Sequence, residues 1–356
     1  MKILLVGEYS NLYTYLRDGF KALGHEAILA SGEDGFKSLK SDININYHGN
    51  NVIEKIKSLA SLIIKSRVFV GYDVVLLVNA QFTRNLFVTK LFYAFLLRKN
   101  KKVFLTAAGD DSLYFDYWKK NSYKEFELYL EGITKYDGYN HRVSWGKKKS
   151  IKWNRNLSGK VSGIIPIMYE YHKVYSEFSN CFNSIPMPIN VDKVHYSENN
   201  LKGNKIVVFH GLNRFGAKGT TYVKEAFDIL QRKYPNHLEL IIDGKMSFDK
   251  YLQVLKRANV VVDQTHSFSL SMNALISMAM GKVVLGGATP ESNIEMEYEI
   301  NPAINITSDP NSIVNAIEFL LENIDEIPKI GYQSRLFIEK NHSYINIAEK
   351  YINIIK

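Results

Sequence analysis

Residues 210–221 read His-Gly-Leu-Asn-Arg-Phe-Gly-Ala-Lys-Gly-Thr-Thr, which combines spaced glycines with two fixed positive charges. Glycine lets a backbone approach a ligand closely, and Arg and Lys side chains suit phosphate oxygens. The pattern predicts a loop that binds a diphosphate. Its candidate binding residues are His210, Gly211, Arg214, Gly216, Lys218 and Gly219.

The elements on either side would place this loop at the end of a sheet. Residues 206–209 form a short apolar run of strand type, and apolar residues then recur at Val223, Phe227 and Leu230 with helical spacing. A helix after Thr220 would add unpaired N–H groups and the positive end of its dipole. The sequence therefore predicts a strand, a phosphate-binding loop and a helix, in that order.

Two named glycine-rich patterns do not fit this loop. It lacks the Gly-Lys-Ser/Thr ending of a P-loop, and its glycines do not have the dinucleotide-binding spacing. An ordinary connection between a strand and a helix, with its two basic residues facing solvent, remains an alternative.

Length and composition favour a two-domain protein of the reducing cytoplasm. The chain has 356 residues, enough for two cores. Cys181 is the only cysteine, so an intramolecular disulfide or a cysteine metal cluster is excluded. The start of the chain is too quickly polar for a signal peptide and reads as a buried strand. No apolar run is long enough to cross a bilayer; the nearest, 86–97, contains Lys90.

The positive charge is confined to the first half of the chain. Residues 1–185 contain 27 Lys and Arg against 17 Asp and Glu, a net charge of +10, whereas the remaining 18 basic and 19 acidic residues leave −1. Such a half would attract an anionic membrane surface, a lipid phosphate or a nucleic acid. The apolar helix expected at 85–97 ends in four basic residues, so it either packs in a core or lies in lipid headgroups. Solvated lysines are the alternative explanation of the charge.

Strands and helices alternate along both halves. In the first, strands at 1–7, 26–30, 73–78 and 103–106 alternate with helical patterns, and Gly7 follows the first strand, where open α/β sheets place ligands. Asp110 and Asp111 also follow a strand, and they either face a substrate or cap the next helix. A second series begins at residue 206. We place the boundary near the prolines at 186 and 188 and expect domains at 1–187 and 188–338.

The residues from 186 to 300 together resemble the GT-B glycosyltransferases that use nucleotide sugars, particularly retaining family 4 and related bacterial surface-polysaccharide enzymes. The matching pieces are Pro-Ile-Asn-Val-Asp at 188–192, the loop above, the strand and turn ending in Asp243-Gly244, and Met-Ala-Met-Gly-Lys at 278–282. The resemblance implies two Rossmann-like domains facing a cleft, with a C-terminal helix (339–356) that crosses back to the first domain. It also implies that Arg214 and Lys218 hold the diphosphate of the donor.

The chain departs from this family at two positions. The retaining enzymes usually have two glutamates eight residues apart, which contact the donor sugar and the ribose; Phe268 and Ile276 stand here instead. The donor must therefore be held by other groups. Candidates are Ser269, Ser271 and Asn273 on the same loop and helix, and Glu291 after a glycine-rich strand end, for which helix capping is the alternative. Asp243, at the end of a strand, is a further expected donor-binding residue.

We expect the chemistry to depend on charge. Breaking the bond between sugar and diphosphate builds negative charge on the leaving group, which Arg214, Lys218 and the helix N-terminus could stabilise without a metal. An inverting enzyme would also need a general base near the acceptor hydroxyl. The catalytic candidates are Asp110, Asp111, His141 and Glu291.

The sequence thus predicts a cytoplasmic glycosyltransferase, peripheral on the inner face of the membrane, in bacterial surface polysaccharide (O-antigen or capsule) synthesis. Its donor would be a UDP- or GDP-linked sugar and its acceptor a lipid-linked oligosaccharide; no cofactor, metal or nucleic acid is expected. The alternatives are an epimerase or a transferase with a soluble or protein acceptor, and a protein that binds sugar nucleotides without turnover.

Overall fold

The computed structural model describes residues 1–32, 41–45, 60, 62–83, 85–137, 145–201, 203, 205–212, 214–244 and 246–356, apart from the side chain of Phe248. The chain forms two compact units. The first unit comprises Met1–Tyr117, His141–Pro188 and Tyr344–Lys356, and the second comprises Trp118–Asn140 and Ile189–Ser343.

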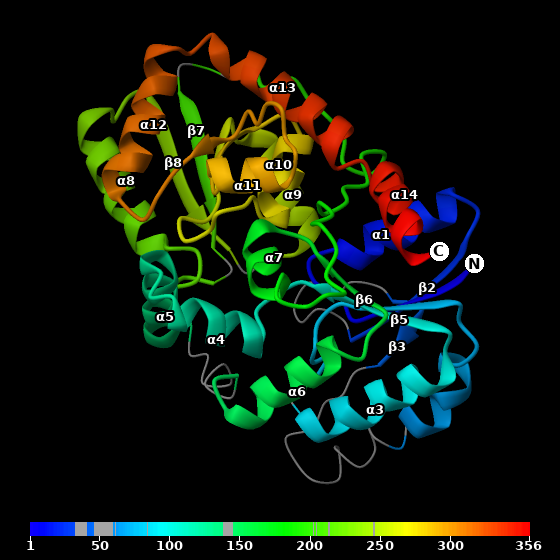
Figure 1. Cartoon of the computed structure of the whole chain (residues 1–356). Helices are drawn as coiled ribbons and strands as arrows, with labels where there is room; N and C mark the ends of the chain where they lie inside the picture. Colours follow the sequence, from blue (N-terminus) through cyan, green and yellow to red (C-terminus); the bar gives the residue numbers. More distant parts are fainter. Residues whose placement is uncertain are drawn as a thin grey trace. The chain divides into compact units, whose positions relative to one another are not determined.

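The first unit is built on a parallel sheet (Figure 1). Within the described residues its strand order is β3-β2-β1-β4-β5-β6. The central strands are buried along their length, as expected of a parallel sheet covered on both faces. The elements are β1 (Lys2–Val6), α1 (Leu12–Ala22), β2 (Glu26–Ser31), β3 (Ile43–Asn44), η2 (Lys65–Phe69), β4 (Val74–Leu77), α3 (Leu86–Lys99), β5 (Lys102–Ala107), α4 (Ser112–Lys120, which crosses into the second unit), α6 (Lys148–Ser158), β6 (Gly163–Pro166), α7 (Tyr169–Tyr175) and α14 (Tyr344–Ile355).

The last helix, α14, packs on α1 in the first unit, as predicted. The rings of Phe20 and Tyr351 meet edge to face at 6.3 Å. Gly19 lets the two helices touch, because a Cβ there would lie 2.3 Å from the carbonyl oxygen of Tyr344. The predicted segment began at 339, but α13 (Glu326–Asn341) continues in the second unit before α14 starts.

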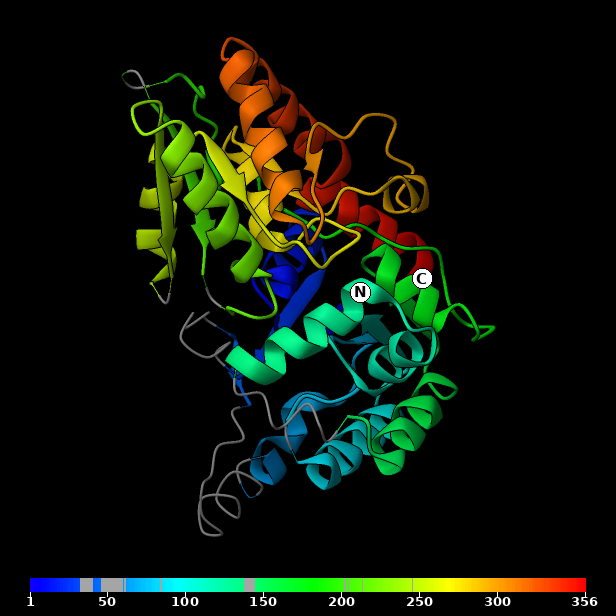
Figure 2. The ribbon, with the colours of Figure 1, turned by 90° about the vertical axis from the view of Figure 1, so that its left-hand side faces the viewer.

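The second unit has its own parallel sheet, with strand order β11-β10-β9-β7-β8 among the described residues. Helices α8 and α12 cover one face of the sheet, and α9 lies on the other (Figures 1 and 2). Alternate strand residues pack against α8 and α12, and Tyr251 of α9 contacts Phe209 of β7. The predicted α/β class with two parallel sheets is therefore confirmed. The elements are α5 (Lys124–Tyr136), β7 (Ile206–Gly211), α8 (Thr220–Lys233), β8 (Leu238–Asp243), α9 (Phe248–Arg257), β9 (Val260–Val262), α10 (Met272–Ala279), β10 (Val283–Gly286), α11 (Pro290–Glu295), β11 (Ile304–Asn305), α12 (Pro310–Glu322) and α13.

The segment Trp118–Asn140, which carries α5, differs from the predicted domain division. The sequence placed it in a first domain at 1–187, whereas the structure clusters it with the second unit. Aromatic contacts explain this placement. Tyr123 stacks on Phe268 with ring centroids 4.6 Å apart, and Tyr136 contacts Phe215 at 4.8 Å.

Candidate functional site

The glycine-rich loop lies at the carboxyl end of β7, at the point where the strand order of the second unit reverses. From β7 the chain proceeds to β8 on one side and then to β9 on the other. In open α/β sheets, ligands bind outside the carboxyl ends of the strands at such a reversal. The loop is therefore where a ligand of this unit is expected.

Residues 214–219 form a helical turn that leads into α8. The N–H of Lys218 donates to the carbonyl of Arg214 at 3.2 Å, and Gly219 precedes the helix with φ +67° and no side-chain cap. A Cβ at Gly219 would lie 2.0 Å from Oγ1 of Thr265, so this position requires glycine. The loop backbone thus passes directly against the segment that follows β9.

The loop already holds an anion through two successive N–H groups. Gly216 donates to Oδ1 of Asp137 at 3.1 Å, and Ala217 donates to Oδ2 at 3.0 Å. Successive backbone N–H groups in a turn form concave sites for carboxylate and phosphate oxygens. In this structure the occupant of the two N–H groups is the side-chain carboxylate of Asp137.

Lys218 is not a free cation. Its Nζ lies 3.1 Å from Oδ1 of Asp263, and both side chains are buried. Asp263 also accepts the N–H of Ser271 at 3.4 Å, so one carboxylate joins the loop to the start of α10. Asp263 was not among the predicted site residues. Its position at the end of a strand, at the same edge as the loop, was the signal that could have identified it. Arg214 is partly exposed on the loop.

His210 supports the site from within and does not face a ligand, which corrects the predicted direct contact. Its Nδ1 lies 2.9 Å from the carbonyl oxygen of Val262, and its Nε2 lies 2.9 Å from Oγ1 of Thr220. A carbonyl only accepts, so Nδ1 carries the proton and Nε2 accepts from the threonine hydroxyl. Burial, together with the nearby Lys218 charge, lowers the pKa of His210 to about 4 and keeps the ring neutral.

The start of α10 supplies two of the predicted donor-binding residues. Ser271 is the N-cap residue of α10, but its side chain makes no capping hydrogen bond. Its Oγ is buried and has no hydrogen-bond partner among the described residues. A buried hydroxyl without a partner costs free energy, which a ligand oxygen placed there would recover. Asn273, two residues later, is partly exposed.

The two positions where the family has glutamates carry apolar contacts here. Phe268 stacks on Tyr123 and contacts Trp118 with ring centroids 5.5 Å apart. Ile276 is 2 % exposed on α10. The first position thus anchors the segment that contains α5, and the second belongs to the core.

Three further predicted residues lie at the same edge of the second sheet or next to it. Gly211 ends β7 and Asp243 ends β8, where the Asp243 carboxylate accepts the N–H of Gly244 at 2.7 Å. Glu291 is exposed in the first turn of α11, and Thr289 rather than Glu291 caps that helix. A carboxylate in a first helical turn is favoured by the helix dipole, which accounts for Glu291 without a ligand.

In the first unit, the equivalent helix N-terminus is occupied by the protein's own carboxylate. Gly7 has φ +91° at the end of β1, and a Cβ there would lie 2.4 Å from Val78. The next residue, Glu8, is buried and accepts the N–H groups of Tyr13 and Thr14 at 3.1 and 2.7 Å. Packing explains Gly7, and the start of α1 is neutralised by Glu8.

Asp111 caps α4, which is the alternative that the sequence left open for it. Its buried carboxylate accepts the N–H groups of Leu113 and Tyr114, both at 2.9 Å, and the hydroxyl of Tyr175. Burial raises the pKa of Asp111. Asp110 is partly exposed beside it and stays a candidate. His141 lies outside the described residues.

The described part of the chain shows neither a metal centre nor a membrane-spanning helix. No group of three or more His, Cys, Asp or Glu side chains there could hold a metal ion. No described helix is long and apolar enough to cross a bilayer.

Part of the chain matches a known protein family. Residues 210–353 match the family model described as glycosyl transferase-like. No curated protein sequence matches the chain.

Solved structures resemble the whole chain. Sucrose-phosphate synthase from Thermosynechococcus elongatus has a TM-score of 0.66 at 12% identity, covering 99% of this chain and 98% of that one. Anabaena HepE in complex with UDP and glucose has a TM-score of 0.61 at 12% identity, with 99% and 98% covered. UDP-GlcNAc 2-epimerase from Neisseria meningitidis has 0.55 at 12% identity, with 100% and 99% covered. The fold is that of the GT-B glycosyltransferases.

Proposed function

We propose that this protein is a glycosyltransferase that binds a nucleotide-diphosphate sugar at the carboxyl edge of its second sheet. One observation carries the proposal: the N–H groups of Gly216 and Ala217 hold a carboxylate, at the reversal point of an α/β sheet. The glycosyl transferase-like match, which begins at residue 210, also supports an enzyme.

The chemistry follows from the charges at this edge. Cleavage of the bond between sugar and diphosphate leaves negative charge on the diphosphate. Arg214 and the uncapped start of α8 would stabilise that charge, and Lys218 would act as half of an ion pair with Asp263. Ser271 and Asn273 would form hydrogen bonds with hydroxyl groups of the sugar or the ribose, in place of the two glutamates usual in the retaining glycosyltransferases.

UDP is the first nucleotide to test. The Anabaena HepE structures contain UDP, UDP with glucose, or UDP-glucose, and a Staphylococcus aureus TarM structure contains UDP. GDP remains the second choice. We further propose Asp110 or Glu291 as the candidate base near the acceptor.

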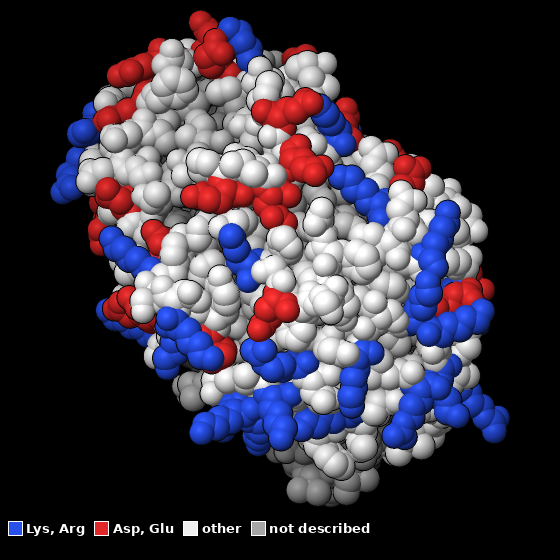
Figure 3. Space-filling view, in the orientation of Figure 1, with Lys and Arg blue, Asp and Glu red and all other residues white. Residues whose placement is uncertain are grey.

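We propose a lipid-linked oligosaccharide as the acceptor and the inner face of the membrane as the place of action, in surface polysaccharide synthesis. Two features of the first unit support this. Figure 3 shows many Lys and Arg side chains gathered in the lower part of the view. Helix α6 of the first unit carries exposed Lys148, Lys149 and Lys152. On α3, Phe87 and Leu91 are 65% and 49% exposed. Basic and apolar side chains together suit an anionic lipid surface.

A second candidate is a protein that binds a sugar nucleotide without transferring the sugar, or isomerises it. The aromatic contacts of Phe268 and the buried Ile276 favour this alternative, because the usual donor-sugar carboxylates are absent there. The resemblance to the Neisseria epimerase fold is consistent with it.

A thermal-shift titration with UDP and GDP tests the donor site. A nucleotide that binds the folded protein raises its melting temperature. We expect UDP to do so, and Arg214→Ala to lose most of the shift. Arg232→Ala is the matched control, since Arg232 is an exposed arginine at the far end of α8. Absence of a shift with every nucleotide at saturating concentration would overturn the proposal.

Product analysis then separates the two candidates. Native protein with UDP-glucose or UDP-N-acetylglucosamine and a lipid-diphosphate oligosaccharide should yield UDP and an extended acceptor. Binding of the donor with no UDP release would identify the non-transferring candidate, and a new epimer of the donor sugar would identify an isomerase.

A further inference from the structure

Two residues near the end of α5 are unfavourable for the helix itself but suit a contact with the glycine-rich loop. Asp137 is the C-cap residue of α5, where a negative charge opposes the helix dipole by about 0.3–1 kcal/mol. Gly132 lies in the helix interior, where glycine costs roughly 1 kcal/mol relative to alanine. Both residues are therefore locally unfavourable, and both are explained by contacts with the loop.

The contact between α5 and the loop is backbone against backbone. A Cβ on Gly132 would lie 2.7 Å from the carbonyl oxygen of Gly216, and a Cβ on Gly216 would lie 1.9 Å from that of Gly132. The ring of Tyr136 packs on Phe215 beside them. These contacts bring the Asp137 carboxylate to the N–H groups of Gly216 and Ala217.

We propose that Asp137 is an internal competitor of the donor. In the free protein its carboxylate holds the two loop N–H groups, and the diphosphate of an incoming sugar nucleotide displaces it and releases the end of α5. The proposal rests on the proposed function for the identity of the ligand. Its physical basis is that a carboxylate and a phosphate oxygen need the same donors and repel each other at close range.

Displacement would couple the donor site to the rest of the chain. The segment Trp118–Asn140 is joined covalently to first-unit residues at both ends. Release of α5 would therefore change a connection to the first unit whenever donor binds. Only molecules in which Asp137 has left the loop can bind the donor there. The apparent affinity for the donor is therefore the intrinsic affinity multiplied by the fraction of such molecules.

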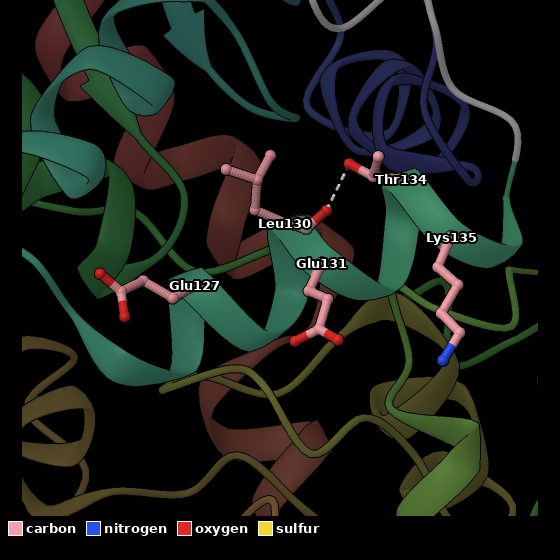
Figure 4. Close-up of a pocket in the computed structure, with 5 residues that line it drawn as sticks. All are labelled: Glu127, Leu130, Glu131, Thr134 and Lys135. Carbon is pink, nitrogen blue, oxygen red and sulfur yellow. Dashed lines mark hydrogen bonds between the residues drawn. The ribbon is translucent and has the colours of Figure 1, made fainter.

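A second carboxylate on α5, that of Glu131, provides a control. Glu127, Leu130, Glu131, Thr134 and Lys135 line an open hollow of about 400 Å³ on this helix (Figure 4). Glu131 is exposed there. Glu131→Gln therefore removes one negative charge from α5, as Asp137→Asn does, but leaves the carboxylate on the loop.

The test is calorimetric titration of UDP and of inorganic pyrophosphate into the native protein and three variants. We expect Asp137→Asn to bind both anions at least about fivefold more tightly and Glu131→Gln to match the native protein within about twofold. Gly132→Ala keeps the Asp137 charge but pushes α5 away from Gly216, so it should also tighten binding. Melting temperatures without ligand will show that each variant folds.

The possible outcomes separate this proposal from the proposed function. Tighter pyrophosphate binding by Asp137→Asn without UDP binding by any protein would support the competitor and overturn the sugar-nucleotide assignment. UDP binding that is unchanged or weaker in Asp137→Asn would overturn the competitor, and weaker binding would show in addition that Asp137 holds the loop in its binding conformation. Binding of neither anion by any of the four proteins would overturn both.

Discussion

At the residue scale, Lys218 has a structural role in addition to its proposed one. Its ammonium and the Asp263 carboxylate are buried together, so removing one partner leaves an uncompensated buried charge. We expect Lys218→Met to lower the free energy of unfolding by about 3–5 kcal/mol. Adding Asp263→Asn should recover most of the loss, because neither charge then remains. Urea denaturation of the native, single and double variants measures this.

The double variant also separates stability from ligand binding. If Lys218 contacts the diphosphate, the double variant Lys218→Met, Asp263→Asn should fold stably but bind UDP at least about tenfold more weakly than the native protein does. If Lys218→Met alone lowered the free energy of unfolding by less than about 1 kcal/mol, the result would contradict a buried ion pair between Lys218 and Asp263.

The sequence could identify the basic residues of the loop but not the acids that bind it. Residue type and glycine spacing indicate an anion site directly, and the loop's hold on a carboxylate agrees with them. Asp263 and Asp137 lie 45 and about 80 positions away from the groups they bind, so only the fold brings them together. Asp111 shows another limit of the sequence. An aspartate after a strand and before a helix fits a helix cap and a catalytic acid equally well, and its hydrogen bonds in the structure are those of a cap.

At the element scale, the sequence predicted strands and helices well because the central strands are continuous apolar runs and the helices have apolar residues at helical spacing. The strand expected at 206–209 is β7 (Ile206–Gly211), and the helix expected after Thr220 is α8. The partner of α5 was not predictable in this way. Its buried residues Phe126 and Ile133 would suit either core. The choice depends on aromatic contacts and on a close approach of two glycines, which hydrophobic patterns do not report.

The contact of α14 with α1 gives a second prediction. We expect Gly19→Ala to destabilise the first unit by about 1–3 kcal/mol, because the new Cβ would lie 2.3 Å from the carbonyl oxygen of Tyr344 and 2.7 Å from Cβ of Ala348. Gly159→Ala is the control: its nearest neighbour would be 3.8 Å away and its φ is −77°. Thermal unfolding and proteolysis of the C-terminal helix measure the effect. Equal stability of the two variants would contradict close packing of α14.

At the scale of the whole molecule, the first unit carries the excess positive charge and also has a group of exposed apolar residues on η2 and α3. Phe69 of η2 contacts Phe92 of α3 with ring centroids 5.1 Å apart, so the exposed Val68 and the exposed Phe87 lie on neighbouring elements. Lys90 of α3 lies 5.7 Å from the ring of Trp153 on α6, which connects this surface to the lysines of α6. The lysines would then attract an anionic membrane at long range, and the apolar side chains of the same surface would be buried among its headgroups.

We therefore expect the protein to sediment with vesicles that contain phosphatidylglycerol and not with pure phosphatidylcholine vesicles. Binding should weaken in 0.5 M NaCl, because each Lys or Arg near the surface contributes only about 1 kcal/mol and is screened by salt. The double change Phe87→Ser, Leu91→Ser should reduce binding at least about tenfold, since it removes the side chains that would enter the headgroups. The matched control is Ile294→Ser, Phe319→Ser, which removes residues of the second unit that are 78% and 48% exposed. Equal losses in both double variants would show that α3 is not the membrane-binding surface, and binding to neither vesicle would favour a soluble acceptor.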